Sequence, residues 1–395
     1  MNAGVREWQR RLNDELQRRR QQSAFRARRV LDSPQAADIE LNHSRLLNFS
    51  SNDYLGLANH PVVVSAFSEA AQHYGVGAGA SHLVIGHSRE HHLLEQAIAK
   101  FTGRERALLF SSGYAANLGV LTALFKKDDV LVLDKLNHAS LIDGALASHA
   151  KTVRYKHCDL DHLEMQLDRQ RSSVCCIVTD SVFSMDGDIA PLDRLAALAE
   201  QYDGLLFVDD AHGFGVLGEH GAGAAEHYSL DQQQLPILMG TLGKALGASG
   251  AFVTGSEVLI ETLIQQSRNY IYTTAIPPAV AAAARAALSV VESDITRRQR
   301  LHKNIAYFKA GLNALGVPEN HSETAIQPVI IGANQDALQV SDALLAAGVA
   351  AVAIRPPTVP AGTARIRFSL TAEHSIEQID MALVALDQAV TALRL

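Results

Sequence analysis

The sequence predicts an α/β protein with a mostly parallel central sheet and a smaller α+β domain on its C-terminal side. Three observations carry this prediction. Short apolar runs alternate with helical stretches between residues 107 and 208. The pattern changes near residue 291, where a long amphipathic helix is expected to begin. The length, 395 residues and 42.6 kDa, exceeds what a single hydrophobic core usually holds.

The apolar runs of the large domain are expected to be buried strands. Helical stretches separate them, which is typical of right-handed βαβ units around a parallel sheet. We therefore expect a helical N-terminal segment over 1–50, a large α/β domain over 51–290 and a small α+β domain over 291–395. An extended segment over 46–50 precedes the expected strands, which cover 107–110, 130–133, 153–155, 174–178 and 205–208.

The C-terminal part predicts a different mixture of elements. A long helix is expected from 291 to 315, strands at 329–331, 351–354 and 365–369, and a terminal helix over 376–393. The apolar segment 277–291 is interrupted by Arg285 and is too short to span a bilayer, so it predicts a buried helix. We expect no membrane association, and the beginning of the chain, rich in Arg and Gln, excludes a secretory signal.

The charge of the chain is unevenly distributed. Residues 1–30 hold nine arginines against three acidic residues, a net +6, which leaves −13 for the rest of a chain whose total is −7. Val5, Trp8, Leu12 and Leu16 recur at helical spacing, so this segment predicts an amphipathic helix that docks its apolar stripe. The acidic remainder would repel phosphate and no recognition motif is present, so we expect no nucleic-acid binding.

The chain contains three cysteines, Cys158, Cys175 and Cys176. Their positions lack the spacing of metal ligands, so we expect no metal site. Buried thiols without a disulfide framework are typical of a reducing compartment. The sequence therefore predicts a cytoplasmic protein.

The residue pair with the clearest chemistry is Asp209 and Lys244. Asp209 follows the apolar run 205–208, and Lys244 lies between glycines in the segment Thr241–Gly247. A lysine can form a Schiff base with the aldehyde of pyridoxal 5′-phosphate (PLP), and a carboxylate can keep the ring nitrogen protonated. Two unit charges about 4 Å apart attract by roughly 4 kcal/mol at an effective dielectric of about 20, which is about three pKa units. The pair therefore predicts PLP.

Other polar residues follow the expected strands. Because ligands of such sheets bind beyond the carboxyl ends of the strands, these residues are candidates for the same site. Gly113 and Tyr114 open a helical stretch whose amides form a natural phosphate seat. His212 near Asp209 is also compatible with a metal site, but two further ligands would be needed. His138 and Ser184 follow two more strands.

Four segments resemble the α-oxoamine synthases, PLP enzymes with the aspartate aminotransferase-like architecture of fold type I. They cover 48–57, 184–188, 209–213 and the surroundings of Lys244, and the resemblance extends over nearly the whole chain. A further segment, 354–365, resembles the subfamily that uses pimeloyl thioesters rather than acetyl or succinyl thioesters. The loop 75–83 departs from the pattern, because Ala80 and His82 stand where relatives often have glycine, and arginine or glycine.

The resemblance implies a role for each matching residue around the cofactor. Lys244 matches the Schiff-base lysine, Asp209 the partner of the pyridine nitrogen and His138 the imidazole stacked over the ring. Ser184 and His212 match residues near the phenolic oxygen of PLP. The phosphate-site neighbourhood is matched by Gly113, Tyr114 and Thr241. The catalytic residues implied are Lys244, His138, Asp209 and His212.

The resemblance also implies substrate-binding positions. Arg26, Thr358, Arg367 and His138 match them, with Arg367 assigned to the carboxylate of the amino acid. A guanidinium suits that task because it binds a carboxylate through two parallel hydrogen bonds. Arg365 lies on the same strand face by its spacing, so an exchange of roles between the two arginines stays open.

The activity that the resemblance implies is a condensation of L-alanine with pimeloyl-CoA or pimeloyl carrier protein in biotin biosynthesis. Carbon dioxide and a free thiol are released, and Lys244 removes the α proton as general base. Two alternatives stay open, namely an enzyme that joins glycine to a short acyl-CoA and a non-catalytic subunit with a PLP-enzyme fold. The resemblance further implies a homodimer with composite sites, to which Thr273 and Thr274 contribute, and an acyl carrier protein as a partner.

Overall fold

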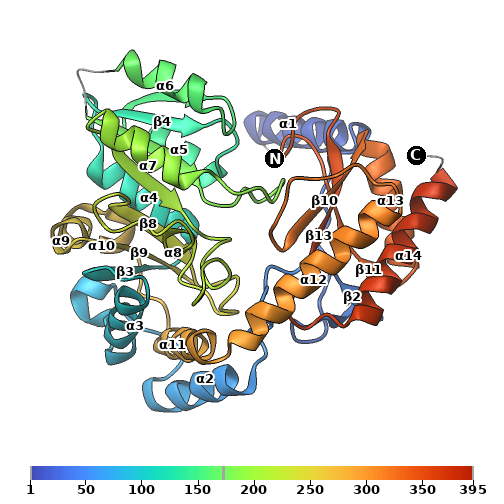
Figure 1. The fold of residues 1–395 in the computed structure, drawn as a ribbon, viewed down its shortest axis with the longest axis horizontal. Coiled ribbons are helices and arrows are strands. Elements are labelled where there is room, and N and C mark those ends of the chain that lie inside the picture. Colours follow the sequence, from blue (N-terminus) through green and yellow to red (C-terminus); the bar gives the residue numbers. More distant parts are fainter. Residues whose placement is uncertain (1, 171–173, 394–395) are drawn as a thin grey trace. The chain divides into compact units, whose positions relative to one another are not determined.

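The computed structural model describes residues 2–170 and 174–393 and divides into two compact units. The first, which we call the large unit, comprises 52–303 and 371–373. The second, the small unit, comprises 1–51, 304–370 and 374–395. The N-terminal segment thus shares a unit with the C-terminal part, and the chain passes between units at 303/304, beyond the boundary expected at 291. Figure 1 labels the elements of both units.

The large unit is built on a seven-stranded sheet with the order β3-β9-β8-β7-β6-β4-β5. The five strands from β8 to β5 run parallel, whereas β9 is antiparallel to both of its neighbours. The expectation of a mostly parallel central sheet is therefore confirmed. The strands are β3 (Arg106–Phe110), β4 (Val130–Asp134), β5 (Lys151–Tyr155), β6 (Cys175–Asp180), β7 (Leu205–Asp209), β8 (Ile237–Thr241) and β9 (Ala251–Gly255).

Two strands of this sheet, β8 and β9, are absent from the sequence-based expectation. Gly240 interrupts the apolar pattern of β8, and glycine inside a strand usually weakens it. In the fold this glycine is required, because a Cβ at residue 240 would lie 2.3 Å from the ring of Phe252 on β9. The close approach of the two strands explains why the local pattern is weak and the pairing nevertheless forms.

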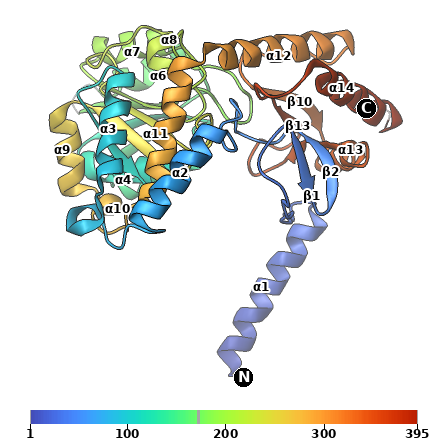
Figure 2. The same cartoon turned by 90° about the horizontal axis from the view of Figure 1, so that it is seen from below.

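Helices surround the sheet. The expected buried helix is confirmed as α11 (Pro278–Ser293), which runs beside α2 (Pro61–Tyr74) (Figure 2). In the described parts of the chain no helix is long and apolar enough to cross a membrane. The other helices of the large unit are η1 (His82–Gly86), α3 (Arg89–Phe101), α4 (Gly113–Leu124), α5 (Ala139–Ala147), α6 (Leu160–Asp168), α7 (Leu192–Gln201), α8 (Ala224–His227), α9 (Glu257–Gln266) and α10 (Arg268–Ile271).

One hydrophobic core of the large unit lies between the sheet and α4, α5 and α9. Leu131, Val178 and Phe207, from three neighbouring parallel strands, are fully buried in it. Every residue of β4 and β6 is buried, which is typical of parallel strands covered on both faces. A scaffold of this kind holds the carboxyl ends of its strands in fixed positions.

The small unit contains two three-stranded sheets with the orders β1-β2-β11 and β10-β13-β12. Phe49, Phe308 and Phe368 pack together in its core, with ring centroids 5.1–6.3 Å apart. The helix α12 (Ile295–Ala314) begins in the large unit and ends in the small one. The remaining elements are α1 (Ala3–Gln21), β1 (Asp38–Leu41), β2 (Ser44–Asn48), β10 (Ile326–Gly332), α13 (Asn334–Ala346), β11 (Val349–Ala350), β12 (Val352–Ile354), β13 (Ala364–Ser369) and α14 (Ile376–Leu393).

The N-terminal helix forms as expected but does not dock its apolar stripe. No residue of α1 is buried, and the helix runs away from the sheets of its own unit (Figure 2). Trp8 is 60% exposed and Leu12 is 45% exposed. The expectation of a docked stripe is therefore wrong for the single chain. Local ion pairs of Arg10 with Glu7 and Asp14 support the helix instead.

Candidate active site

The candidate site lies where the parallel strands of the large unit end. Asp180 is the last residue of β6 and pairs in register with Asp209, the last residue of β7. The strands are parallel, so their carboxyl ends share one edge of the sheet. The loops that follow β4, β6 and β8 carry His138, Ser184 and Lys244.

Asp209 is buried and held in a fixed orientation. The side-chain amide of Asn117 on α4 donates to its Oδ2 atom at 2.6 Å, and the backbone N–H of Ala211 donates to Oδ1 at 2.9 Å. Both donors are neutral, so neither cancels the negative charge of the carboxylate. The sequence analysis missed Asn117, although an amide in the otherwise apolar stretch 115–121 is a signal for such a contact.

His138 caps the N-terminus of α5 and lies close to the same carboxylate. Its backbone N–H donates to Asp180 Oδ2 at 2.8 Å, and its Nδ1 atom lies 2.7 Å from Ser140 Oγ. Burial lowers the pKa of His138, Asp209 opposes this shift and Lys244 adds to it. The imidazole is therefore neutral at neutral pH. The same interactions show that His138, Asp209 and Lys244 share one electrostatic neighbourhood.

Lys244 is half-buried in the turn between β8 and β9. The Thr241 hydroxyl accepts from the Gly243 N–H at 3.2 Å and donates to the Gly250 carbonyl at 3.0 Å. The Lys244 carbonyl accepts from the Gly247 N–H at 2.8 Å. Gly247 has φ +63°, and a Cβ there would lie 2.1 Å from a backbone nitrogen, so only glycine fits. The turn thus fixes the position of the lysine backbone.

Two further carboxylates surround this cluster. Burial, followed by the nearby Asp209, raises the pKa of Asp180 well above its usual range. Burial raises the pKa of Asp210 to about 7, although Ser181 Oγ donates to it at 2.6 Å and the Ala224 N–H at 2.9 Å. Lys244 lowers the pKa of both groups. These two aspartates hold the loops around the site.

His212 is buried beside Tyr54, which lies in the segment 48–57. The hydroxyl of Tyr54 lies 2.7 Å from Nδ1 of His212, and both residues belong to the large unit. Ser184 is partly exposed in the loop that follows β6. His212 is thus fixed by a hydrogen bond with Tyr54, and Ser184 lies in a loop.

The N-terminus of α4 presents backbone amides at the end of β3. The Ser112 hydroxyl caps the helix by accepting from the Ala115 N–H at 3.1 Å. Tyr114 is 44% exposed, and its hydroxyl donates to Asp143. Ala115 is thereby satisfied by the cap, whereas Gly113 and Tyr114 occupy the first turn, where amides point along the helix axis.

The small unit brings two of the predicted substrate residues together. The guanidinium of Arg26 donates to the hydroxyl of Thr358 at 2.9 Å. Both line a pocket of about 570 Å³ that Arg29 and Arg355 also line. Burial lowers the pKa of Arg355, and the neighbouring Arg26 lowers it further. The pocket therefore concentrates positive charge.

Arg365 and Arg367 lie on β13 of the same unit and are 4% and 8% exposed. Arg365 donates from Nε to the Thr363 carbonyl at 3.1 Å and from Nη2 to its hydroxyl at 3.2 Å. Two nitrogens of the Arg365 guanidinium are therefore hydrogen-bonded to Thr363, two residues earlier in the chain. Arg26, Thr358 and Arg367 thus belong to the small unit, and the other predicted site residues belong to the large unit.

Histidines cluster around the loop that departs from the family pattern. His82, His87 and His91 have ring nitrogens within 4.8 Å of one another. Burial lowers the pKa of His82 to about 3, so its ring is neutral. Both nitrogens of His91 are engaged, Nδ1 with the Ser88 N–H and Nε2 with the Ile276 carbonyl. These contacts give His91 a structural role in anchoring α3.

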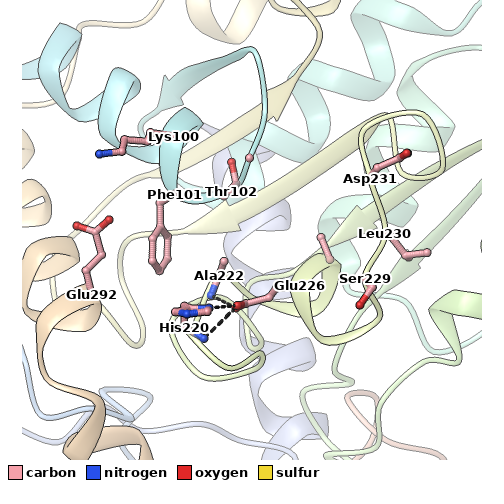
Figure 3. Close-up of a pocket in the computed structure, with 12 residues that line it drawn as sticks. Lys100, Phe101, Thr102, His220, Ala222, Glu226, Ser229, Leu230, Asp231 and Glu292 are labelled. Carbon is pink, nitrogen blue, oxygen red and sulfur yellow. Dashed lines mark hydrogen bonds and ion pairs between the residues drawn. The ribbon is translucent and has the colours of Figure 1, made fainter.

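A different pocket of about 670 Å³ lies elsewhere in the large unit, and its lining contains none of the predicted site residues. Figure 3 shows His220 beside Glu226 in this pocket, with Nδ1 2.6 Å from Oε1. Lys100 of α3 and Glu292 of α11 also line this pocket. This pocket is therefore separate from the cluster around Lys244.

Comparisons with known proteins agree with this geometry. The model of the aminotransferase class I and II family matches residues 44–386. An 8-amino-7-oxononanoate synthase of Nitrosococcus oceani is 54% identical over 95% of this chain and 99% of its own length. The chain belongs to the 8-amino-7-oxononanoate synthase family. A further member, from Methylococcus capsulatus, is 54% identical over 93% of this chain and 95% of its own length.

Solved structures of this family and its relatives have the same fold. Serine palmitoyltransferase from S. paucimobilis, solved with a bound PLP–myriocin adduct, has a TM-score of 0.91 and 31% identity over 97% of both chains. The 8-amino-7-oxononanoate synthase of Francisella tularensis has a TM-score of 0.78 and 35% identity over 89% of this chain and 99% of that one. Fold type I of the PLP-dependent enzymes is therefore confirmed.

Proposed function

We propose that the chain condenses L-alanine with a pimeloyl thioester to give 8-amino-7-oxononanoate, carbon dioxide and a free thiol, a step of biotin biosynthesis. A bond forms between the α-carbon of alanine and the thioester carbonyl carbon, the C–S bond breaks, and the alanine carboxyl group leaves as carbon dioxide. The observation that carries this proposal is the shared neighbourhood of Lys244, His138 and Asp209 at the strand ends, in a chain 54% identical to named relatives.

The residues of this neighbourhood fit PLP. Lys244 would hold its carbonyl carbon, Asp209 would hold a proton at the ring nitrogen, and the amides of Gly113 and Tyr114 with the Thr241 hydroxyl would bind the phosphate. The fit rests on Asp209, whose buried carboxylate is fixed by the neutral donors Asn117 and Ala211. When bound, PLP supplies an electron-poor ring that stabilises negative charge on the α-carbon.

Lys244 is proposed to take the α proton of alanine, and the structure supports this role through the charge around it. A general base must be neutral before it accepts a proton, and its ammonium form must be tolerated afterwards. Lys244 lies within electrostatic range of Asp180 and Asp210 and lowers the pKa of both, so the ionised form of either carboxylate stabilises that ammonium form. His138, kept neutral by burial, would orient the substrate as a hydrogen-bonding group without competing for this charge. Ser184 and His212 are proposed to contact the phenolic oxygen of the cofactor.

Substrate carboxylates are proposed to bind arginines of the small unit. Arg367 is assigned to the carboxylate of alanine, because its position matches the substrate-binding arginine that the family resemblance implies. Arg26 and Thr358 are proposed to bind the acyl substrate, because their hydrogen bond lies in a pocket with further arginines. Each assignment uses the ability of a guanidinium to bind a carboxylate or phosphate through paired hydrogen bonds.

The proposed substrates can be tested by measuring thiol release. We expect L-alanine with a pimeloyl thioester to react fastest. Glycine should lower kcat/KM by about 10-fold or more, since a missing methyl group costs roughly 1–3 kcal/mol of transition-state binding. An acetyl thioester should lose more, because it lacks most of the acyl chain. Mass spectrometry should identify 8-amino-7-oxononanoate as the product.

The comparison also separates the alternative activities. Faster reaction of glycine with a short acyl thioester would replace the proposed substrates with those of another α-oxoamine synthase. No thiol release with any pair would favour a non-catalytic subunit. Parallel assays with pimeloyl-CoA and pimeloyl carrier protein would identify the thioester carrier that the enzyme prefers.

We further propose a cytoplasmic homodimer. Cys175 and Cys176 are buried thiols whose pKa is raised by burial, which fits a reducing compartment. The exposed apolar stripe of α1 and the exposed side chains of residues 83–85 support a second copy as the covering surface. Thr273 and Thr274 are proposed to contribute to the site of the partner.

A substitution in the stripe tests the dimer. Trp8→Glu should raise the dimer dissociation constant by at least about 10-fold, because buried aromatic residues carry much of the binding energy at interfaces. Sedimentation velocity measures this constant. Gln17→Glu, which makes the same charge change away from the stripe, should leave it unchanged. A wild-type monomer at all concentrations would contradict the homodimer.

A further inference from the structure

His157 bridges two buried or partly buried carboxylates beside the candidate site. It follows β5, and its Nδ1 atom lies 3.0 Å from Asp134 Oδ1 while its Nε2 atom lies 2.8 Å from Asp188 Oδ2. An ionised carboxylate can only accept hydrogen bonds, so both ring nitrogens must donate. Between two ionised carboxylates the ring is therefore an imidazolium ion.

The surroundings of His157 keep this positive charge. Burial by itself would lower the pKa of His157, but the hydrogen bonds to Asp134 and Asp188 outweigh burial and raise the pKa to about 12. Two further titratable neighbours, Cys158 and Tyr155, remain neutral at pH 7. Burial raises the pKa of Cys158, and burial together with Asp134 raises that of Tyr155. A single cation thus faces two anions in this cluster.

Asp134 connects His157 to the loop that carries His138. Asp134 is the fully buried last residue of β4, and His138 follows four residues later. The Oδ1 atom of Asp134 also accepts from the Leu136 N–H at 2.8 Å, and the Oδ2 atom of Asp134 accepts from the Cys158 N–H at 2.9 Å. The carboxylate therefore sets the course of the chain from the end of β4 towards His138.

Asp188 connects His157 to the loop that carries Ser184. The Asp188 carbonyl accepts from the Phe183 N–H at 3.0 Å, and the Phe183 carbonyl accepts from the Gly187 N–H at 2.7 Å, so these bonds close the turn around Ser184. The ring of Phe183 meets the His157 ring edge to face, with centroids 4.3 Å apart. Both ends of this turn thus rest on the histidine.

We propose that His157 is a positioning residue, which fixes the loops of His138 and Ser184 relative to each other by holding Asp134 and Asp188 on opposite sides of one imidazolium ring. The inference rests on the proposed function for the roles of His138 and Ser184. Without this cation the two carboxylates repel each other, and the turn 183–188 loses its anchor on β4. Glutamine cannot replace the ring, because both of its N–H donors lie on one nitrogen and its other terminal atom is an oxygen that only accepts, so it cannot donate to carboxylates on opposite sides.

The first experiment measures the loops without cofactor or substrate. Hydrogen–deuterium exchange of the apoprotein should be at least about 10-fold faster in peptides covering 181–188 for His157→Gln than for wild type. The matched control is His162→Gln. His162 lies on the following helix, its Nδ1 atom accepts from the Lys156 N–H, and neither of its ring nitrogens contacts a carboxylate in the described parts of the chain. This control should exchange like wild type.

The second experiment measures the consequence for the site. His157→Gln should weaken PLP binding and should lower kcat by up to about 100-fold, because a displacement of about 1 Å can cost that much in rate. The KM for L-alanine should change little. Asp188→Asn should have a similar effect, and the double variant should add little to either single one. Additive effects of the two substitutions would overturn the bridge.

The third experiment observes the charge directly and covers the case in which the variants fold poorly. In ¹⁵N NMR spectra of the wild-type apoprotein, both ring nitrogens of His157 should stay protonated from pH 6 to about pH 9, as expected for a pKa of about 12. Titration of His157 in the ordinary histidine range would overturn the proposal. Because this readout and the exchange measurement use no substrate, their failure is distinguishable from a failure of the proposed reaction.

Discussion

Replacing Lys244 by alanine should leave a folded protein that has lost turnover. We expect kcat for thiol release from a pimeloyl thioester to fall by at least about 10³-fold, since a general base contributes roughly 10²–10⁴-fold and the lysine would also hold the cofactor. The fold should survive because the turn depends on backbone groups. The Lys244 carbonyl bonds the Gly247 N–H, and alanine keeps that carbonyl.

The readouts for Lys244 should separate chemistry from folding. Far-ultraviolet circular dichroism and the unfolding temperature should stay near those of wild type. Borohydride reduction followed by peptide mapping should find a pyridoxyl group on Lys244 in wild type and none at residue 244 in the variant. Lys135→Ala is the matched control, because Lys135 is an exposed lysine at the end of β4. Turnover of the Lys244→Ala variant near the wild-type rate would refute the proposed base.

The parallel part of the sheet could be predicted because its signal is local. Buried strands are often continuous apolar runs, and the runs ending at residues 133, 155, 178 and 208 correspond to four of the five parallel strands, while the run ending at residue 110 corresponds to the edge strand β3. The terminal helix was predicted with its bounds because its apolar spacing is regular. In contrast, β8 contains Gly240, whose role depends on Phe252 of the neighbouring strand. A single sequence does not reveal that pairing.

The candidate site was partly predictable for a similar reason. Lys244 and Asp209 carry recognisable motifs, so their roles could be proposed from the chain alone. Asn117 lies 92 residues before Asp209, and their hydrogen bond exists only because α4 packs on the sheet near β7. His157 stands between carboxylates 23 residues before it and 31 residues after it. Residues that position others through the fold leave little trace in local patterns.

For the N-terminal helix, the sequence predicted a packing contact that the single chain does not make. Its stripe of Val5, Trp8, Leu12 and Leu16 was expected to dock within the chain, yet the stripe is exposed. Periodicity reports which face of a helix is apolar, but it does not report whether the same chain or another covers that face. The proposed homodimer would account for this difference, because a second copy would supply the missing surface.

Replacing Asp209 by asparagine should produce the other large loss of activity. If Asp209 holds the proton on the ring nitrogen, two unit charges at about 4 Å would attract by roughly 4 kcal/mol, so removal of the carboxylate should lower kcat by about 10³-fold. The structure also predicts a stability cost. The two oxygens of Asp209 accept from Asn117 and Ala211, and an asparagine can accept at only one of these positions. One buried donor is left unpaired, which costs about 1–3 kcal/mol.

The two effects of Asp209→Asn can be measured separately. Steady-state thiol release gives kcat, and urea unfolding gives the change in the free energy of unfolding. The pH dependence of the visible spectrum of the bound cofactor reports the proton on the ring nitrogen, which should be lost at lower pH in the variant than in wild type. Asp203→Asn is the matched control, because Asp203 is exposed in the turn before β7 at φ +50°, a conformation that asparagine tolerates. An Asp209→Asn variant that kept the wild-type kcat and spectrum would contradict the proposed pairing of this carboxylate with the ring nitrogen of the cofactor.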